Sequence, residues 1–163
     1  MAKRPNQRLK LLYLAKIMLR LTDDEHGLQV EQIINELAKY DIAAERKSIY
    51  SDLEALQLFG IDIEKKHIGR YVYYCVGNRN LELAELKLLV DAVQSSKFIT
   101  EKKSSQLIEK LERYVSRYEA KQLNQQVYVH GRIKTMNESI YYNVDAIHTA
   151  IAENKKIIFQ YFQ

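Results

Sequence analysis

The residues best suited to chemistry in this 163-residue chain lie between positions 44 and 59. Ile49, Leu53 and Leu56 recur there at the spacing of a helix with one buried face. The opposite face carries basic and hydroxyl side chains in its first two turns, namely Arg46, Lys47, Ser48, Tyr50 and Ser51. An Arg side chain can fork onto the O6 and N7 atoms of guanine, and hydroxyl groups can donate to phosphates or bases. This arrangement predicts a helix that reads the major groove of DNA.

Two further basic clusters flank this helix in the sequence. One follows it and contains Lys65, Lys66, His67 and Arg70. The other lies near the N-terminus and contains Lys3, Arg4, Arg8 and Lys10. We expect both clusters to touch the sugar-phosphate backbone of DNA, or, for the hairpin cluster, an adjacent minor groove. Residues 1–76 hold 12 Lys or Arg and 11 Asp or Glu, so binding must depend on the segregation of charge rather than on its total.

The order of the surrounding elements predicts a winged helix-turn-helix over residues 1–76. A first helix is indicated by an apolar face of Leu11, Leu14, Ala15, Met18 and Leu21, which is widened by Leu9, Leu12 and Leu19. A second helix is predicted at about residues 30–40, and Gly60 is expected to end the third. After Gly60 the apolar period changes from 3.6 to 2, so residues 61–76 are expected to form a β-hairpin, the wing.

The rest of the chain is expected to be mostly helical, which makes the fold class mostly α (α+β). Residues 77–80 are predicted to be a linker, and residues 81–125 a helical linker or dimerisation region with one helix capped by Thr100. Residues 126–133 and 156–163 are expected to form strands. Between them Asn143 is expected to cap a helix in which three residues face inward: Val144, Ile147 and Ile151.

Several segments resemble the HTH/WYL-type regulators, bacterial transcription factors with a DeoR-like winged helix. RKSIYSDLEAL at residues 46–56 and FGIDI at residues 59–63 are similar to the recognition helix and wing entry of that family. LAELKLLVDAV at residues 83–93, FIT at 98–100 and LIEKL at 107–111 are similar to its helical linker. IIFQY at residues 157–161 resembles the first strand of its WYL sensor domain. The resemblance implies a transcriptional regulator in which residues 126–163 are the truncated start of that domain.

The chain departs from this family in two ways. It lacks the WYL tripeptide, and one strand cannot complete the sensor barrel. We therefore expect either an excised fragment or a naturally shortened member, and ligand sensing is not carried over to this chain. Ser51 stands where arginine is frequent in the family, so one phosphate or base contact of the family is not expected here.

Composition argues against several other classes of protein. The chain is 47% hydrophobic and has one proline, which is typical of a folded and largely helical protein. Its single cysteine, Cys75, excludes an intramolecular disulfide and is expected to be a small buried residue. No apolar stretch approaches the ~20 residues of a membrane helix, and the N-terminus has no apolar signal core. A cytoplasmic protein is therefore expected.

No catalytic site, metal site or cofactor is expected, so the chain is predicted not to be an enzyme. Its four histidines lack the spacing of a zinc site: His26, His67, His130 and His148. The sequence also lacks the glycine motifs of nucleotide-binding loops and of a nucleophilic serine.

Double-stranded DNA is the expected partner, and the chain is expected to be a homodimer, because dimeric helix-turn-helix proteins match two half-sites. The linker helices, at about residues 81–117, are expected either to form the dimer surface or to support the segment that does. The net charge of +4 is compatible with this function without requiring it.

The alternative is a winged-helix module that binds proteins instead of DNA. Such a module would present an exposed apolar stripe on the third helix.

Overall fold

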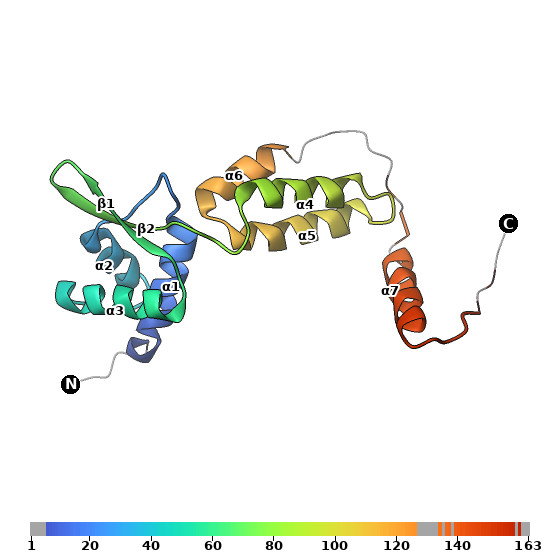
Figure 1. Cartoon of the computed structure of the whole chain (residues 1–163), viewed down its shortest axis with the longest axis horizontal. Helices are drawn as coiled ribbons and strands as arrows, with labels where there is room; N and C mark the ends of the chain where they lie inside the picture. Colours follow the sequence, from blue (N-terminus) through green and yellow to red (C-terminus); the bar gives the residue numbers. More distant parts are fainter. Residues whose placement is uncertain (1–5, 127–133, 135, 138, 159, 161–163) are drawn as a thin grey trace.

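The computed structural model describes residues 6–126, 134, 136–137, 139–158 and 160. This part of the chain is mostly helical and has one two-stranded antiparallel sheet (Figure 1). Its elements are η1 (Gln7–Leu9), α1 (Lys10–Leu21), α2 (Val30–Ala38), α3 (Arg46–Phe59), β1 (Ile63–Ile68), β2 (Tyr71–Val76), α4 (Leu83–Ser95), α5 (Glu101–Leu111), η2 (Glu112–Tyr114), α6 (Arg117–Gln126) and α7 (Ser139–Ala152). None of the described helices combines the length and the apolar character that a membrane span requires.

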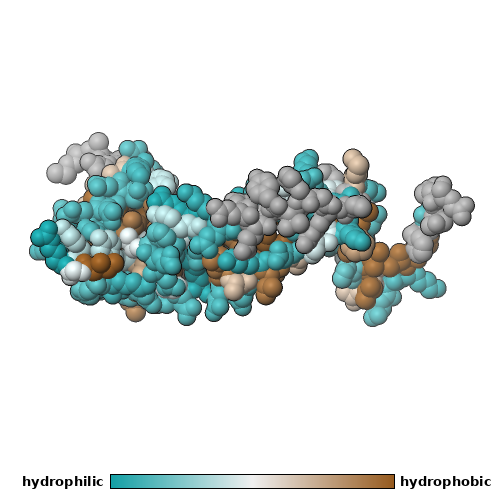
Figure 2. All heavy atoms as spheres, turned by 90° about the horizontal axis from the view of Figure 1, so that it is seen from above, coloured by the Kyte–Doolittle hydropathy of each residue, from teal (hydrophilic) through white to brown (hydrophobic). Residues whose placement is uncertain are grey.

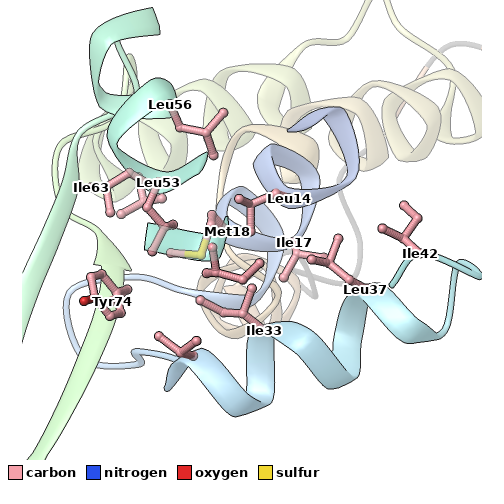
Figure 3. Close-up of a cluster of buried hydrophobic side chains, with 13 residues drawn as sticks. Leu14, Ile17, Met18, Ile33, Leu37, Ile42, Leu53, Leu56, Ile63 and Tyr74 are labelled. Carbon is pink, nitrogen blue, oxygen red and sulfur yellow. The ribbon is translucent and has the colours of Figure 1, made fainter. Parts of the chain in front are cut away.

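The first three helices and the hairpin enclose one hydrophobic cluster (Figure 3). From α1 it takes Leu14, Ile17 and Met18, which follow one another at the i, i+3, i+4 spacing. The predicted apolar face of α1 was therefore too wide. Four of its leucines are at least 37% exposed, namely Leu9, Leu11, Leu12 and Leu19, whereas Ile17 is buried. Only one side of α1 can face α2, α3 and the hairpin, so these leucines are left outside the core.

The third helix begins and ends for identifiable reasons. Ile49, Leu53 and Leu56 are buried as predicted. Gly60 ends the helix in the left-handed conformation, with φ of 107°, which glycine adopts without steric cost. The start lies at Arg46 rather than at residue 44, and Glu45 in the N-cap position makes no side-chain cap. The side chains of Ala43 and Ala44 carry no oxygen with which to cap an earlier start.

The hairpin is held against the helices on both of its strands. β1 and β2 pair in a continuous register that runs from Ile63 opposite Val76 to Ile68 opposite Tyr71. The backbone of Tyr74 also exchanges two hydrogen bonds with Leu28, at 2.8 and 2.9 Å. The Gln57 amide of α3 donates to the Ile63 carbonyl at 2.5 Å. These bonds fix the hairpin relative to α3.

A second hydrophobic cluster joins α4, α5 and α6. Its buried members are Leu86, Val90, Ile108, Val115, Ala120 and Leu123. Thr100 caps α5 as predicted, because its hydroxyl accepts a hydrogen bond from the Lys103 amide at 3.2 Å. Figure 1 shows α4 and α5 side by side, with α6 lying across one end.

Residues 77–80, predicted to be a linker, are fixed between the two clusters. The guanidinium of Arg79 donates to the carbonyls of Leu19 and Thr22 at 3.0 and 2.6 Å. It also lies 3.8 Å from the carboxylate of Glu119 in α6. The backbone amide of Gly77 bonds the Asp62 carbonyl at 3.0 Å. The segment therefore holds its neighbours together and does not act as a loose spacer.

A buried carboxylate strengthens this junction. Asp23 is 6% exposed and accepts hydrogen bonds from the Ser116 hydroxyl at 2.5 Å and from the Glu25 and His26 amides. The His26 ring nitrogen lies 2.7 Å from the same carboxylate, and its ring stacks on Tyr118 with centroids 3.7 Å apart. Burial alone would raise the pKa of Asp23, but these hydrogen bonds outweigh it and lower the pKa below 3.8.

The C-terminal elements differ from expectation. α7 begins at Ser139, before the predicted cap Asn143. Val144, Ile147 and Ile151 are 40%, 42% and 66% exposed, so the prediction that they face inward was wrong for the described part of the chain. Figure 2 shows brown apolar side chains on the surface of α7. An amphipathic pattern indicates a helix but not its partner.

The two predicted strands near the C-terminus have different outcomes. Gln126 belongs to α6, and the rest of the first strand, residues 127–133, lies outside the described residues. Residues 156–158 and 160 are described and contain no strand. A strand needs hydrogen bonds from a neighbouring strand, which an apolar run by itself does not supply.

We predict that replacing Asp23 with Ala lowers the free energy of unfolding by about 1–3 kcal/mol near neutral pH, because the hydrogen-bond donors of Ser116 and His26 lose their acceptor. The folded pKa of Asp23 lies below its unfolded value of 3.8, so its contribution is complete above that pH and is lost as the pH falls through the folded value. Urea unfolding of both proteins between about pH 2 and 7 measures this. A difference that does not shrink in acid would contradict the role of the carboxylate.

A second prediction concerns the bond between α1 and α3. Lys10 and Asp52 form an ion pair at 2.5 Å with side chains only 15% and 16% exposed. Replacing Lys10 with Met leaves the Asp52 carboxylate without its cation and should cost about 1–3 kcal/mol in urea unfolding. The matched control is Lys39→Met. Lys39 pairs with Glu36 at 2.6 Å but is 65% exposed, so its loss should cost less than about 0.5 kcal/mol. Equal costs would contradict this assignment.

Candidate nucleic-acid interface

The exposed face of α3 carries most of the residues predicted to read DNA. Arg46, Lys47, Tyr50, Ser51 and Glu54 are all exposed. The two cations stand in the first turn, where the backbone amides point out of the helix and give it a partial positive charge. Basic side chains and helix dipole thus favour an anion at the same end of α3.

Arg46 and Tyr50 interact along this face. The Nε atom of Arg46 donates a hydrogen bond to the Tyr50 hydroxyl at 3.0 Å. The same hydrogen bond raises the pKa of Arg46 above the ordinary value of an arginine, so the guanidinium remains charged. The two residues are one helical turn apart, the spacing at which side chains on a helix surface meet.

A groove of about 700 Å³ runs between α3 and the hairpin. Its lining includes the cationic side chains of Arg46, Lys65 and Arg70. It also includes two carboxylates, Glu31 and Glu54. A molecule in this groove therefore meets cations from α3 and the hairpin and carboxylates from α2 and α3.

The basic residues of the hairpin divide between its two sides. Lys65 stands opposite Tyr74 in the register, and both line the groove. His67 and Arg70 are exposed, and Arg70 donates to the Tyr71 hydroxyl at 2.9 Å. Lys66 comes one residue after Lys65, and successive strand residues point to opposite faces.

Lys66 is engaged within the protein. Its ammonium donates to the Asp24 carbonyl at 2.8 Å and lies 3.5 and 3.4 Å from the carboxylates of Asp24 and Glu64. Lys66 thus ties the hairpin to the loop that precedes α2. Of the predicted hairpin residues it is the least suited to meet a phosphate.

Ser48 is likewise engaged, because its side chain is half-buried between α1 and α3. It accepts a hydrogen bond from the Lys10 ammonium, and its hydroxyl lies 3.4 Å from the Asp52 carboxylate. Ser51 is exposed and bonds only weakly, at 3.4 Å, to the Ser48 carbonyl. The structure thus brings Ser51 to the outer face and turns Ser48 toward α1.

The N-terminal cluster lies partly outside the described residues. Arg4 is among the residues that the structure does not describe, while Arg8 is exposed in η1. The amide of Gln7 donates to the Ala43 carbonyl at 3.0 Å, and that of Asn6 to the Tyr40 carbonyl at 2.9 Å. These bonds hold the segment that carries Arg8 near the start of α3.

Glu31 and Tyr74 are among the residues of the groove that sequence reasoning missed. Glu31 lies in the first turn of α2, and Tyr74 belongs to β2. Both reach the groove through tertiary packing, so no local spacing could have found them. Alternation along β2 gave a partial signal, since Tyr74 stands opposite the basic residue Lys65.

Within the described residues, no group of three or more His, Cys, Asp or Glu side chains is placed to hold a metal ion. Comparison with known proteins adds no relative. No protein-family model, no curated protein and no solved structure matches this chain.

Proposed function

We propose that this chain is a sequence-specific transcriptional regulator that binds double-stranded DNA through a winged helix-turn-helix formed by α1 to β2. The observation that carries the proposal is the exposed face of α3, where Arg46, Lys47 and Tyr50 stand at the positive end of the helix beside a groove with further cations. A helix that enters the major groove uses its N-terminal residues on base edges.

In this proposal the two elements have different tasks. α3 is the recognition helix, and Arg46 reads a base edge while Lys47 and Ser51 contact phosphates or neighbouring bases. The hairpin is the wing, and Lys65, His67 and Arg70 contact the sugar-phosphate backbone. Glu31 and Glu54 line the same groove, and their carboxylates repel phosphates, so the DNA backbone approaches the basic side chains instead.

The wider assignment follows the resemblance of the sequence to HTH/WYL-type regulators. We propose a bacterial cytoplasmic protein that acts as a homodimer on two half-sites, with the linker helices as the dimer surface. α4 offers apolar side chains for this contact, since Leu88 is 71% and Leu89 42% exposed.

One observation favours a second candidate, a module that binds a protein. Leu58 and Phe59, at the C-terminal end of α3, are 91% and 83% exposed. This apolar pair lies at the opposite end of the helix from Arg46.

Binding of arbitrary duplex DNA across a range of salt concentrations separates the two functions. A steep fall in affinity with salt supports contacts with the DNA backbone, whereas no binding at low salt supports the protein-binding module.

We predict different effects for a reading and an anchoring residue. Arg46→Ala should cost on the order of 1–3 kcal/mol of binding to a duplex selected from a random pool, and should relax discrimination at one base pair. Lys65→Gln should weaken all duplexes alike and reduce the salt slope by about one unit. Lys66→Gln is the control within the hairpin, and its smaller effect on the salt slope follows from its contacts with Asp24 and Glu64. Fluorescence anisotropy titrations measure all three. Identical behaviour of Arg46→Ala and Lys65→Gln would contradict the division.

We also predict that the chain has the mass of two copies in solution at micromolar concentration, as measured by sedimentation equilibrium. Replacing Leu88 and Leu89 together with Ser should shift the equilibrium toward one copy, because it removes apolar area from the proposed contact. Leu12→Ser, which changes a leucine of α1 that is 69% exposed, is the control. A single-copy mass for the unchanged chain would contradict the homodimer.

A further inference from the structure

We infer that Tyr50 is a positioning residue for Arg46, and that it holds the guanidinium so that its two terminal nitrogens together face a guanine. The inference rests on the proposed function and adds a determinant of its specificity. It begins from the hydrogen bond at 3.0 Å between the Nε atom of Arg46 and the Tyr50 hydroxyl.

The bond to Tyr50 uses the Nε–H of Arg46 and not a terminal nitrogen. A guanidinium has five N–H donors in a planar fork, and the pair of terminal Nη groups can bond the O6 and N7 atoms of guanine together. The Tyr50 hydroxyl takes the Nε–H and leaves that terminal pair unused. Among the residues that the structure describes, none accepts a hydrogen bond from the Nη atoms of Arg46.

Tyr50 is itself held in position by a neighbouring aromatic ring. Its ring lies 6.4 Å from the ring of Tyr74 with the planes inclined at 51°, a tilted aromatic contact. Tyr74 is 9% exposed, and its backbone is fixed by two hydrogen bonds to Leu28. The hairpin therefore limits the movement of Tyr50, and through Tyr50 it limits the movement of Arg46.

Without the bond to Tyr50, the Arg46 side chain would be less well oriented for two reasons. Arg46 is exposed, and an exposed Arg side chain samples many rotamers that binding must freeze. The carboxylate of Glu31 lines the same groove and attracts the guanidinium. The Tyr50 hydroxyl reduces both the entropy cost of binding and the displacement of Arg46 toward Glu31, because it fixes the end of the Arg46 side chain before DNA binds. Its removal should therefore reduce the preference for guanine more than it reduces general affinity.

The test uses Tyr50→Phe in the full chain, which keeps the ring and removes only the hydroxyl. Duplexes are first selected with the unchanged protein, and affinity is then measured for the selected duplex and for versions with each guanine replaced. We expect Tyr50→Phe to lower discrimination at one guanine by about three- to tenfold, to reduce affinity for arbitrary duplex by a smaller factor, and to leave the salt slope unchanged because no cation is removed. Tyr13→Phe, which removes a hydroxyl from a ring that packs on Tyr40 in the helical core, is the matched control and should change none of these.

A double-mutant cycle shows whether Tyr50 acts through Arg46. In an Arg46→Ala background, Tyr50→Phe should have no further effect on discrimination. A second measurement needs no DNA. Exchange of the Arg46 Nε proton with solvent, followed by NMR, should be faster in Tyr50→Phe than in the unchanged protein, and equal in Tyr13→Phe.

The outcomes separate this inference from the proposed function. If the protein binds DNA and Arg46→Ala loses discrimination while Tyr50→Phe does not, the positioning role of Tyr50 is overturned. The regulator proposal then remains in place. An effect of Tyr50→Phe that persists in Arg46→Ala also overturns the positioning role, since Tyr50 would then contact DNA by itself. Absence of binding to any duplex at low salt by the unchanged protein overturns the proposed function and this inference with it.

Discussion

Burial of Ile49, Leu53 and Leu56 fixes the rotation of α3 about its own axis, and the remaining features of the candidate interface depend on that rotation. Side chains on a helix are about 100° apart, so committing one face to the core determines what the opposite face presents. Arg46, Lys47 and Tyr50 face solvent for this reason alone. The hairpin then packs along α3 and turns the exposed face into one wall of a groove.

The basic residues of α1 to β2 are divided between structure and surface. Lys10 is paired with Asp52 between two helices, and Lys66 with Asp24 and Glu64 beside the hairpin. These cations stabilise the arrangement of the elements. Arg46, Lys47 and Lys65 remain on the outer surface, where charge is available to a ligand. A nearly neutral segment thereby keeps exposed cations on α3 and the hairpin, beside the carboxylates of Glu31 and Glu54.

A polar junction joins the helical pair α4 and α5 to the first three helices. Arg79 bonds two carbonyls at the end of α1, and Asp23 accepts from Ser116 at the start of α6. Hydrogen bonds between buried groups are directional, so this junction specifies an orientation that an apolar contact alone would not. The position of the linker helices is therefore tied to that of the hairpin. The Val76 amide of the hairpin also donates a hydrogen bond to the Thr22 hydroxyl at 3.0 Å.

The elements that could be predicted from the sequence are those whose cause is local. Apolar spacing located α2, α3 and α4, Gly60 ended α3, Thr100 capped α5, and the change of period at Gly60 located the hairpin. Tertiary structure decided which leucines of α1 are buried, which cations are paired, and that Glu31 and Tyr74 reach the groove. It also left the apolar side of α7 exposed. Periodicity and caps act within a few residues, whereas ion pairs and grooves arise between segments that only the folded chain brings together.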